Sequence, residues 1–342
     1  MRPIYTALAV FFSATASAQM NDSLLHYYEY VNKAEMQIVD SNYQQAIALY
    51  ETGFSFKKHP FGRDMYNHAV CAVLTKEYSK VHSDLKHLIA KGYPLDSLQA
   101  RSTFNDFFLS KNGKELVKYA KDYLPQDNVG LREMYDSMFV LDQFYRKKHG
   151  SYAVYGDTIE KIDNANVDLV RALIDEHGFP SQNLIGVYPS FDYKAFGIMV
   201  IHNQFGNRFG QYFNYTEILY NGIYSGILDV RTAIQLLSGS TGNGDLYGFE
   251  FMGLVRHGIE GDTTLALTPW GFYSLKDEKM KLEIDSKRAD VGLCGLLDAR
   301  VKIVLGLREK RFFLTDAAGK KTNLWSNKKD YQNAVEYTVI LE

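Results

Sequence analysis

The sequence predicts a mainly α-helical protein that ends in a small antiparallel β element, an α+β arrangement in which helical hairpins pack on a second helical domain. Two similar stretches lie 35 residues apart near the start of the chain, and apolar residues recur at helical spacing through its middle. Short runs rich in β-branched and aromatic residues follow near the end. The length of 342 residues suggests about two domains.

These patterns divide the chain. We expect a signal peptide over residues 1–18, a helical repeat region over 19–124, a linker over 125–130, a helical domain over 131–300 and a β-rich extension over 301–342. The linker is assigned because Pro125 stops a helix and polar residues follow it.

The first residues have the parts of a secretory signal peptide. Arg2 precedes an apolar run from Ile4 to Phe12, and small residues end at Ala18, after which we expect cleavage. A buried N-terminal helix is the alternative, but the sequence offers no amphipathic segment against which this apolar run would pack. The run is shorter than the roughly 20 residues that span a bilayer, and no later segment is apolar enough to do so. We therefore expect a soluble periplasmic or secreted protein without a transmembrane segment.

Charge and motifs argue against several classes of function. A formal net charge of −2 gives no electrostatic basis for binding nucleic acid or an anionic membrane. The chain lacks the glycine-rich phosphate loops, the zinc-protease motif and the nucleophile-elbow motif, so we predict no cofactor and no metal. Cys71 lies in an apolar helical stretch, which favours a buried free thiol; a Cys71–Cys294 disulfide between the domains is the alternative.

The helical repeat region contains two related helix pairs. Ala34 and Ala69 are 35 residues apart, and so are Tyr43 and Tyr78. Each tyrosine lies at the start of the second helix of its pair. This spacing resembles the tetratricopeptide repeat, whose period is about 34 residues. A degenerate third pair is expected over residues 95–123. Such arrays present a concave surface to a peptide or protein partner; the alternative is that this array only supports its own C-terminal domain.

Two helices are expected at the start of the second domain. The first covers residues 133–148, and Asp142 lies one turn before Arg146, where an ion pair supports a helix. The second begins after a cap at Asp163 or Asn164.

Further helices follow. The helix after Asp163 should end at Gly178, because glycine readily adopts the left-handed conformation that terminates a helix. Another is expected over residues 191–203, with His202 near its end. Asp229 lies at the start of a later helix, where an acid suits the helix dipole. Arg231 is two residues further on and is expected to point to a different face.

The C-terminal sheet is predicted from five apolar or alternating runs. They cover residues 249–254, 263–267, 301–305, 311–314 and 335–341.

The polar motifs of the second domain, taken in order, resemble those of a bacterial family of unknown function. That family's pattern is D-Q-x-x-R, an Asp-x-x-Asn before a helix, G-[WF]-P, a helix ending in His, D-R before a helix, Q-x-Y-G-T and R-R-x-x-x-G-L. Its members are mostly helical domains that often follow helical repeats in exported proteins of the Bacteroidetes type. The residues that carry the resemblance are Asp142, Gln143, Arg146, Asp163, Asn166, Gly178, Pro180, His202, Asp229, Arg231, Tyr247, Gly248, Arg288, Gly292 and Leu293.

The chain also departs from the family's pattern. Val230 separates the Asp-Arg pair, Asp245 replaces a glutamine, and Phe249 replaces a threonine. Lys287 stands at the second basic position, and Asn203 follows the motif histidine in place of an acid. An active site built on these groups would be altered or lost here.

Two functions remain open. The first is a soluble exported interaction or scaffold protein that binds a peptide or envelope partner through its helical repeats. It rests on the repeats, the signal peptide and the missing catalytic motifs. The sequence favours this function, although it assigns no specific activity, no partner identity and no oligomeric state.

The second is a hydrolase-like enzyme or a small-ligand binder. His202 would act as the base, Asp229 would orient it and Arg231 would hold an anion. The candidate ligand-binding residues are Asp142, Arg146, Asp163, Asn166, Tyr247 and Arg288. This function rests only on the polar pattern, and it requires these side chains to converge on one pocket.

Overall fold

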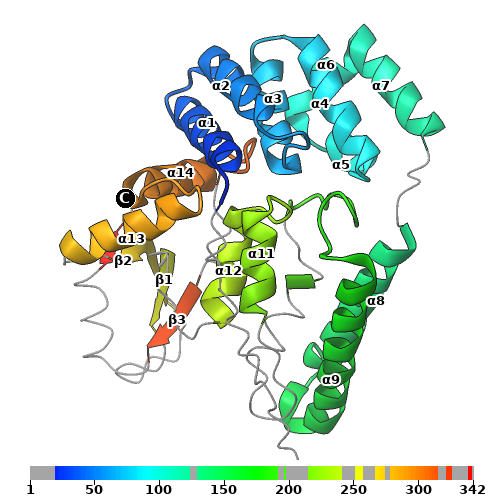
Figure 1. Ribbon diagram of the computed structural model, residues 1–342, viewed down its shortest axis with the longest axis vertical. Helices are drawn as coiled ribbons and strands as arrows, with labels where there is room; N and C mark the ends of the chain where they lie inside the picture. The colour runs from blue at the N-terminus through cyan, green and yellow to red at the C-terminus, as the bar shows by residue number, and fades with distance from the viewer. Residues whose placement is uncertain are drawn as a thin grey trace, which may run out of the picture.

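The structure is a computed structural model that describes residues 20–123, 129–191, 196–197, 215–240, 251–256, 266–273, 278–314, 321–325 and 338–340. Several predictions lie outside these residues, namely the signal peptide, most of the linker and the candidate site residues His202 and Tyr247. The described part is mainly helical and contains packed helical hairpins, as the sequence predicted. Figure 1 shows the N-terminal helices grouped at one end of the molecule.

Two helical hairpins open the array, the name used here for residues 20–123. Their helices are α1 (Asp22–Val39), α2 (Tyr43–Ser55), α3 (Gly62–Leu74) and α4 (Tyr78–Ala90). Ser41 and Lys76 make the turns within the hairpins, with left-handed φ values of 60° and 63°. Ala34 and Ala69 are both fully buried. The backbone therefore repeats with the same 35-residue offset as the sequence.

The last part of the array is less regular. It consists of α5 (Leu95–Gln99), a 3₁₀ helix (Ser102–Phe104), α6 (Asn105–Leu109) and α7 (Lys111–Asp122). Gly113 lets α7 approach α6 closely, because a Cβ at this position would lie 2.2 Å from the carbonyl oxygen of Phe107. Ser110 caps α7 by accepting a hydrogen bond from the Gly113 N–H.

Two long helices follow, and their bounds differ in part from the prediction. They are α8 (Val129–Arg146) and α9 (Ser151–His177). Gly150, at a φ of 87°, makes the turn between them, so α9 begins well before the predicted cap at Asp163. The end of α9 was predicted correctly, since Gly178 follows it at a φ of 82°.

The remaining described helices are α11 (Thr216–Tyr224), α12 (Val230–Ser240), α13 (Glu278–Asp290) and α14 (Leu296–Arg308). The predicted strand over residues 301–305 is wrong, because these residues belong to α14. The segment buries Leu296, Ala299 and Ile303, which recur at the spacing of one helix face. This pattern of burial outweighs the preference of its β-branched residues for a strand. Residues 311–314 form no strand either, and follow α14 without regular structure.

The described strands form a four-stranded sheet in the order β3-β1-β2-β4. They are β1 (Phe251–Arg256), β2 (Ala266–Tyr273), β3 (Lys321–Trp325) and β4 (Thr338–Ile340). β2 pairs antiparallel with both β1 and β4, whereas β1 and β3 are parallel. The sheet is therefore mixed rather than antiparallel, and the long connection through α13 and α14 permits the parallel pair.

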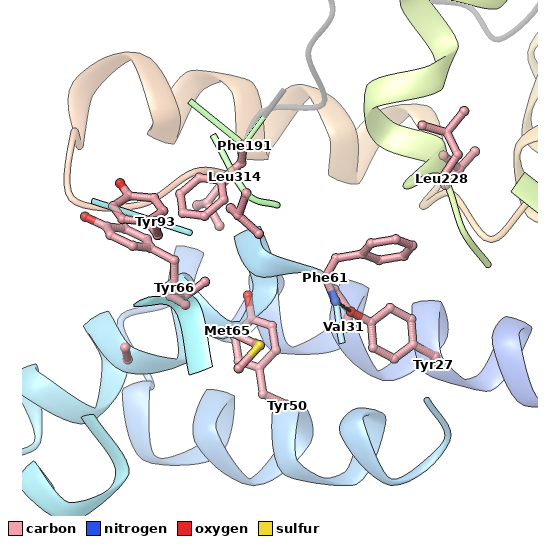
Figure 2. Close-up of a cluster of buried hydrophobic side chains, with 14 of the residues drawn as sticks. Tyr27, Val31, Tyr50, Phe61, Met65, Tyr66, Tyr93, Phe191, Leu228 and Leu314 are labelled. Atoms are coloured by element: carbon pink, nitrogen blue, oxygen red, sulfur yellow. Dashed lines mark hydrogen bonds between the residues drawn. The ribbon is translucent and has the colours of Figure 1, made fainter. Parts of the chain in front are cut away.

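One apolar core joins the array to the second domain. Tyr66 on α3 contacts Phe191 and Phe313, with ring centroids 5.3 and 5.1 Å apart. Tyr93 stacks on Phe191 at 5.2 Å. Figure 2 shows Tyr66, Tyr93 and Phe191 gathered with Leu314 in this core.

Asn67 on α3 fixes the main chain of Phe313. Its side-chain nitrogen donates to the Phe313 carbonyl oxygen at 3.0 Å, and its side-chain oxygen accepts from the Phe313 N–H at 2.9 Å. The array therefore holds a segment of its own chain, residues 311–314, with both apolar and main-chain contacts.

Candidate functional site

Asp229 and Arg231 lie together at the start of α12. Asp229 immediately precedes the helix, and its carboxylate turns back to accept hydrogen bonds from the main-chain N–H of Arg231 at 3.1 Å and from its Nε at 2.9 Å. The expectation that the two side chains point to different faces is therefore wrong. The expectation treated both residues as helical, whereas Asp229 lies outside the helix and caps it.

Arg231 reaches from α12 into the array. One terminal nitrogen donates to Oε1 of Glu35 on α1 at 3.0 Å. The other donates to Oδ2 of Asp64 on α3 at 2.7 Å and to Oδ2 of Asp229 at 2.9 Å. The side chain is only 1% exposed. Its guanidinium is thus already surrounded by three carboxylates, which leaves it poorly placed to hold a substrate anion.

Two more cations complete this cluster, which we call the buried ion network. Nζ of Lys302 on α14 donates to Oε2 of Glu35 at 2.7 Å and to Oδ1 of Asn32 at 3.1 Å. A terminal nitrogen of Arg63 lies 3.7 Å from Oε1 of Glu35. The network contains equal numbers of acids and bases, namely Glu35, Asp64, Asp229, Arg63, Arg231 and Lys302. A buried charge is tolerated when it is paired in this way.

Two tyrosines of α1 extend the network with hydrogen bonds. The hydroxyl of Tyr27 donates to Asp64 and accepts from the Phe61 N–H at 3.1 Å. The hydroxyl of Tyr28 accepts from the Val230 N–H at 3.2 Å, next to the carboxylate of Asp229. Burial raises the pKa of both hydroxyls well above their usual range, so they remain donors.

The pKa values of the acids differ within the network. Burial alone would raise the pKa of Glu35, but the charges of Lys302, Arg231 and Arg63 outweigh it and hold this pKa below its ordinary value. The same balance lowers the pKa of Asp229. For Asp64 burial exceeds the effect of Arg231, and its pKa is raised.

A second set of predicted site residues connects α8 to α9. Arg146 donates to Oδ1 of Asp142 at 2.9 Å on its own helix. It also donates to both carboxylate oxygens of Asp163 on α9, at 2.6 and 2.7 Å. Gln143 donates to the other oxygen of Asp142 at 2.7 Å, and Asn166 is buried one turn beyond Asp163. Paired, bidentate contacts of this kind fix the two helices to each other.

Arg288 lies at a third place. Its Nε donates to the Cys294 carbonyl oxygen at 2.6 Å, across the turn that follows α13. Gly292 in this turn has a φ of 78°, and a Cβ there would lie 2.6 Å from the ring of Tyr28. Asn32 donates to the Gly292 carbonyl oxygen at 2.9 Å. The Arg-Gly-Leu motif thus shapes a turn that packs on α1.

The described residues of the predicted site therefore form three groups on different elements instead of one pocket. His202 and Tyr247 lie outside the described residues. Cys71 and Cys294 are both buried and free, so the structure contains no disulfide between them.

The structure also contains an open cavity that the sequence did not reveal. This junction pocket has a volume of about 530 Å³ and lies between the array and the second domain. It is lined by His59, Ala90, Lys91, Gly92, Arg132, Glu133, Asp136, Gln182, Asn183, Leu184, Ile185 and Gly186. Lys91 and Gly92 directly follow α4, and their local sequence points to no pocket. Apart from Ala90 and Gly92, the other lining residues lie 32 to 95 positions from Lys91, and no local pattern links them to it.

Within the described residues, no group of three or more His, Cys, Asp or Glu side chains is arranged to hold a metal ion. None of the helices that the structure describes combines the length and apolar character needed to cross a bilayer.

Comparisons with protein-family models, with curated proteins and with solved structures found no match to the chain. The resemblance to a family of unknown function therefore stays a prediction.

Proposed function

We propose that the protein is an exported, non-catalytic binding protein, and that it contacts a protein partner through the end of the α8–α9 hairpin. The observation that carries this proposal is a group of large apolar side chains left exposed there. Val140, Leu141, Phe144, Tyr152 and Val154 are 48–64% exposed. Several large apolar side chains left exposed on one hairpin are typical of a protein-interaction site.

The exposed group, called the hairpin tip here, is supported by a rigid base. Arg146 connects the two helices through Asp163 and also donates to the Tyr152 hydroxyl at 3.0 Å. The ring of Phe144 packs against Tyr145 at 5.0 Å, and Nζ of Lys148 lies 4.2 Å from the centre of the Phe144 ring. In Figure 1 the hairpin, drawn in green, extends away from the array. Pre-ordered aromatic residues lose little entropy on binding.

The charge around the hairpin tip indicates the kind of partner. Lys147, Lys148 and His149 are exposed at the turn between the helices. The charge of Arg146 is already paired, whereas these residues are open to solvent. An apolar partner segment with acidic flanks would complement both features.

This location differs from the one expected from the sequence, which was the repeat surface. On the described part of that surface, Asn67 and Tyr66 already hold residues 311–314 of the same chain. A partner peptide would have to displace this segment, in which Leu314 is fully buried. The hairpin tip requires no such displacement.

The hydrolase-like alternative has less support. Asp229 and Arg231 are both buried in the ion network, and neither lines the junction pocket. An enzyme would need at least one of them within reach of a substrate.

Site-specific photo-crosslinking tests the proposal. A photoreactive phenylalanine analogue at position 144, in the organism that encodes the protein, should yield one discrete adduct with another protein. Leu141→Asp in the same chain should reduce that adduct by about fivefold or more, because a buried charge opposes apolar contact. Both positions are exposed, so the fold should be retained, as checked by circular dichroism.

The matched control places the same analogue at Glu115, an exposed residue of α7. An adduct that forms equally at Glu115, or that persists with Leu141→Asp, would contradict the proposal. Binding to phosphatidylglycerol vesicles that depends on Phe144 would assign the hairpin tip to a membrane surface instead.

A further inference from the structure

We propose that the junction pocket is a binding site for an oxyanion, the carboxylate or phosphate group of a small ligand, held by Lys91 and Arg132. This site is separate from the hairpin tip and independent of the function proposed for it. Three features of the pocket support this proposal: a lysine without an acidic partner in the described part of the chain, an arginine whose guanidinium two glycines accommodate, and a cavity of suitable size.

Lys91 is half-buried and has no acidic partner among the described residues. Within the described part of the chain, its Nζ donates only to the Pro60 carbonyl oxygen, at the long distance of 3.4 Å. Burial, together with the nearby charge of Lys57, lowers the pKa of Lys91 to about 8. A desolvated ammonium with one weak acceptor has unused hydrogen-bonding capacity. An anion in the pocket would supply the missing partner.

The side chain of Arg132 lies against Gly92 and Gly186, next to the main chain of Lys91. Gly92 and Gly186 have φ values of 79° and 80°, and a Cβ on either residue would lie 3.2 Å from a terminal nitrogen of Arg132. The guanidinium lies over the ring of Tyr188 at 4.2 Å. The same nitrogen is 3.5 Å from the carbonyl oxygens of Gly92 and Val187, which is too long for strong hydrogen bonds.

A main-chain hydrogen bond joins Lys91 to the turn against which Arg132 packs. The Val187 N–H donates to the Lys91 carbonyl oxygen at 2.8 Å, so the turn that carries Gly186 is fixed to the end of α4. Gln182, which also lines the pocket, accepts from the Gly62 N–H at 2.8 Å through its side-chain oxygen. The group that Gln182 can offer a ligand is therefore an N–H donor, which also suits an anion.

The acids around the pocket do not neutralise Lys91. Glu133 is exposed at the rim. Asp136 is engaged elsewhere, because it accepts from the Tyr188 hydroxyl at 2.8 Å and lies 3.9 Å from Nε of Arg132. Burial lowers the pKa of His59, and the positive charges of Lys91, Lys58 and Lys57 lower it further. Among the described lining residues, no acid therefore pairs with the ammonium group of Lys91.

The volume of about 530 Å³ sets the class of ligand. Pockets of roughly 300–1,000 Å³ accommodate small organic molecules. The apolar part of the lining comes from Ala90, Leu184 and Ile185. A small molecule that joins one carboxylate or phosphate to a short apolar body fits both the charge and the lining.

Nuclear magnetic resonance of the full chain with ¹³C-labelled lysine tests the site. Inorganic phosphate and sodium acetate serve as separate probes, and sodium chloride at equal ionic strength serves as the control. The signal of Lys91, assigned by its loss in Lys91→Met, should shift with at least one probe in a saturable way. The pKa of Lys91 should then rise, because an anion favours the charged form. The probe that binds more tightly identifies the oxyanion.

Variants of the lining residues test whether the anion binds in the junction pocket. Arg132→Gln should weaken binding by about tenfold, the loss expected for a hydrogen bond to a charged group. Lys91→Arg should retain binding, and Lys118→Met, which alters an exposed lysine of α7, should leave it unchanged. The Lys91 shift in the unmodified protein remains a test even if a variant fails to fold. No shift with either probe, or a shift that sodium chloride reproduces, would overturn the proposal.

Discussion

At the residue scale, Arg231 shows how a polar sequence motif can serve the fold. Its guanidinium contacts carboxylates from α1, from α3 and from the residue that precedes α12. Each of these carboxylates is buried, so none could remain charged without a cation close by. The geometry of a planar guanidinium, with several donors directed to different sides, explains why an arginine occupies this position.

Replacing Arg231 should therefore impair folding. Arg231→Met retains the apolar length of the side chain but removes the charge, which leaves Glu35, Asp64 and Asp229 with too few cations. We expect the free energy of unfolding to fall by about 3–5 kcal/mol, the usual effect of removing one partner from a buried ion pair. Urea unfolding followed by circular dichroism measures this loss.

The matched control is Arg171→Met on the exposed face of α9. It should lower the free energy of unfolding by less than about 1 kcal/mol, because surface charges contribute little. An Arg231→Met protein as stable as the unmodified one would show that the residue is not required for the fold.

At the element scale, the array acts as a binding surface for a segment of its own chain. Residues 311–314 belong to no helix or strand, so their main chain depends on side chains for hydrogen bonds. Asn67 supplies both a donor and an acceptor to Phe313, and the ring of Phe313 packs on Tyr66 and Phe191. The segment after α14 is thereby attached to α3.

Asn67→Ala tests this attachment, and hydrogen exchange at the Phe313 N–H reports the result. The Phe313 N–H would lose its acceptor, so it should exchange with deuterium at least about tenfold faster than in the unmodified protein. The free energy of unfolding should fall by about 1–3 kcal/mol, the cost of leaving buried main-chain groups unpaired.

Asn42→Ala, at an exposed asparagine that precedes α2, serves as the control and should change stability by less than about 0.5 kcal/mol. Unchanged exchange at Phe313 in Asn67→Ala would mean that apolar packing alone holds the segment.

At the scale of the whole molecule, the array and the second domain are joined by a common core and by the buried ion network. Both join elements that are far apart in sequence, for example Lys302 with Glu35 and Arg231 with Asp64. The two parts are expected to stabilise each other, since two complete hairpins and an irregular third part form a short array.

Local patterns predicted much of the helical part, and long-range contacts explain what they missed. The starts of α2 at Tyr43 and of α4 at Tyr78, and the end of α9, follow from local signals, namely a repeat offset and a terminal glycine. The strand predicted over residues 301–305 failed because the buried face of α14 depends on packing against α1. The roles of Arg231 and Lys91 could not be predicted either, because Glu35 and Asp64, which pair with Arg231, and Val187, which bonds to Lys91, lie on distant segments.

We infer that these contacts make the array and the second domain one cooperative unit. Native-state hydrogen exchange of the unmodified protein, followed by mass spectrometry, tests it most directly. We predict that the slowest amides of α1, α3, α12 and α14 exchange with the same free energy of opening, equal to that of global unfolding. If α12 and α14 lost protection at a distinctly lower free energy while α1 and α3 stayed protected, the two parts would be separable and the claim would be contradicted.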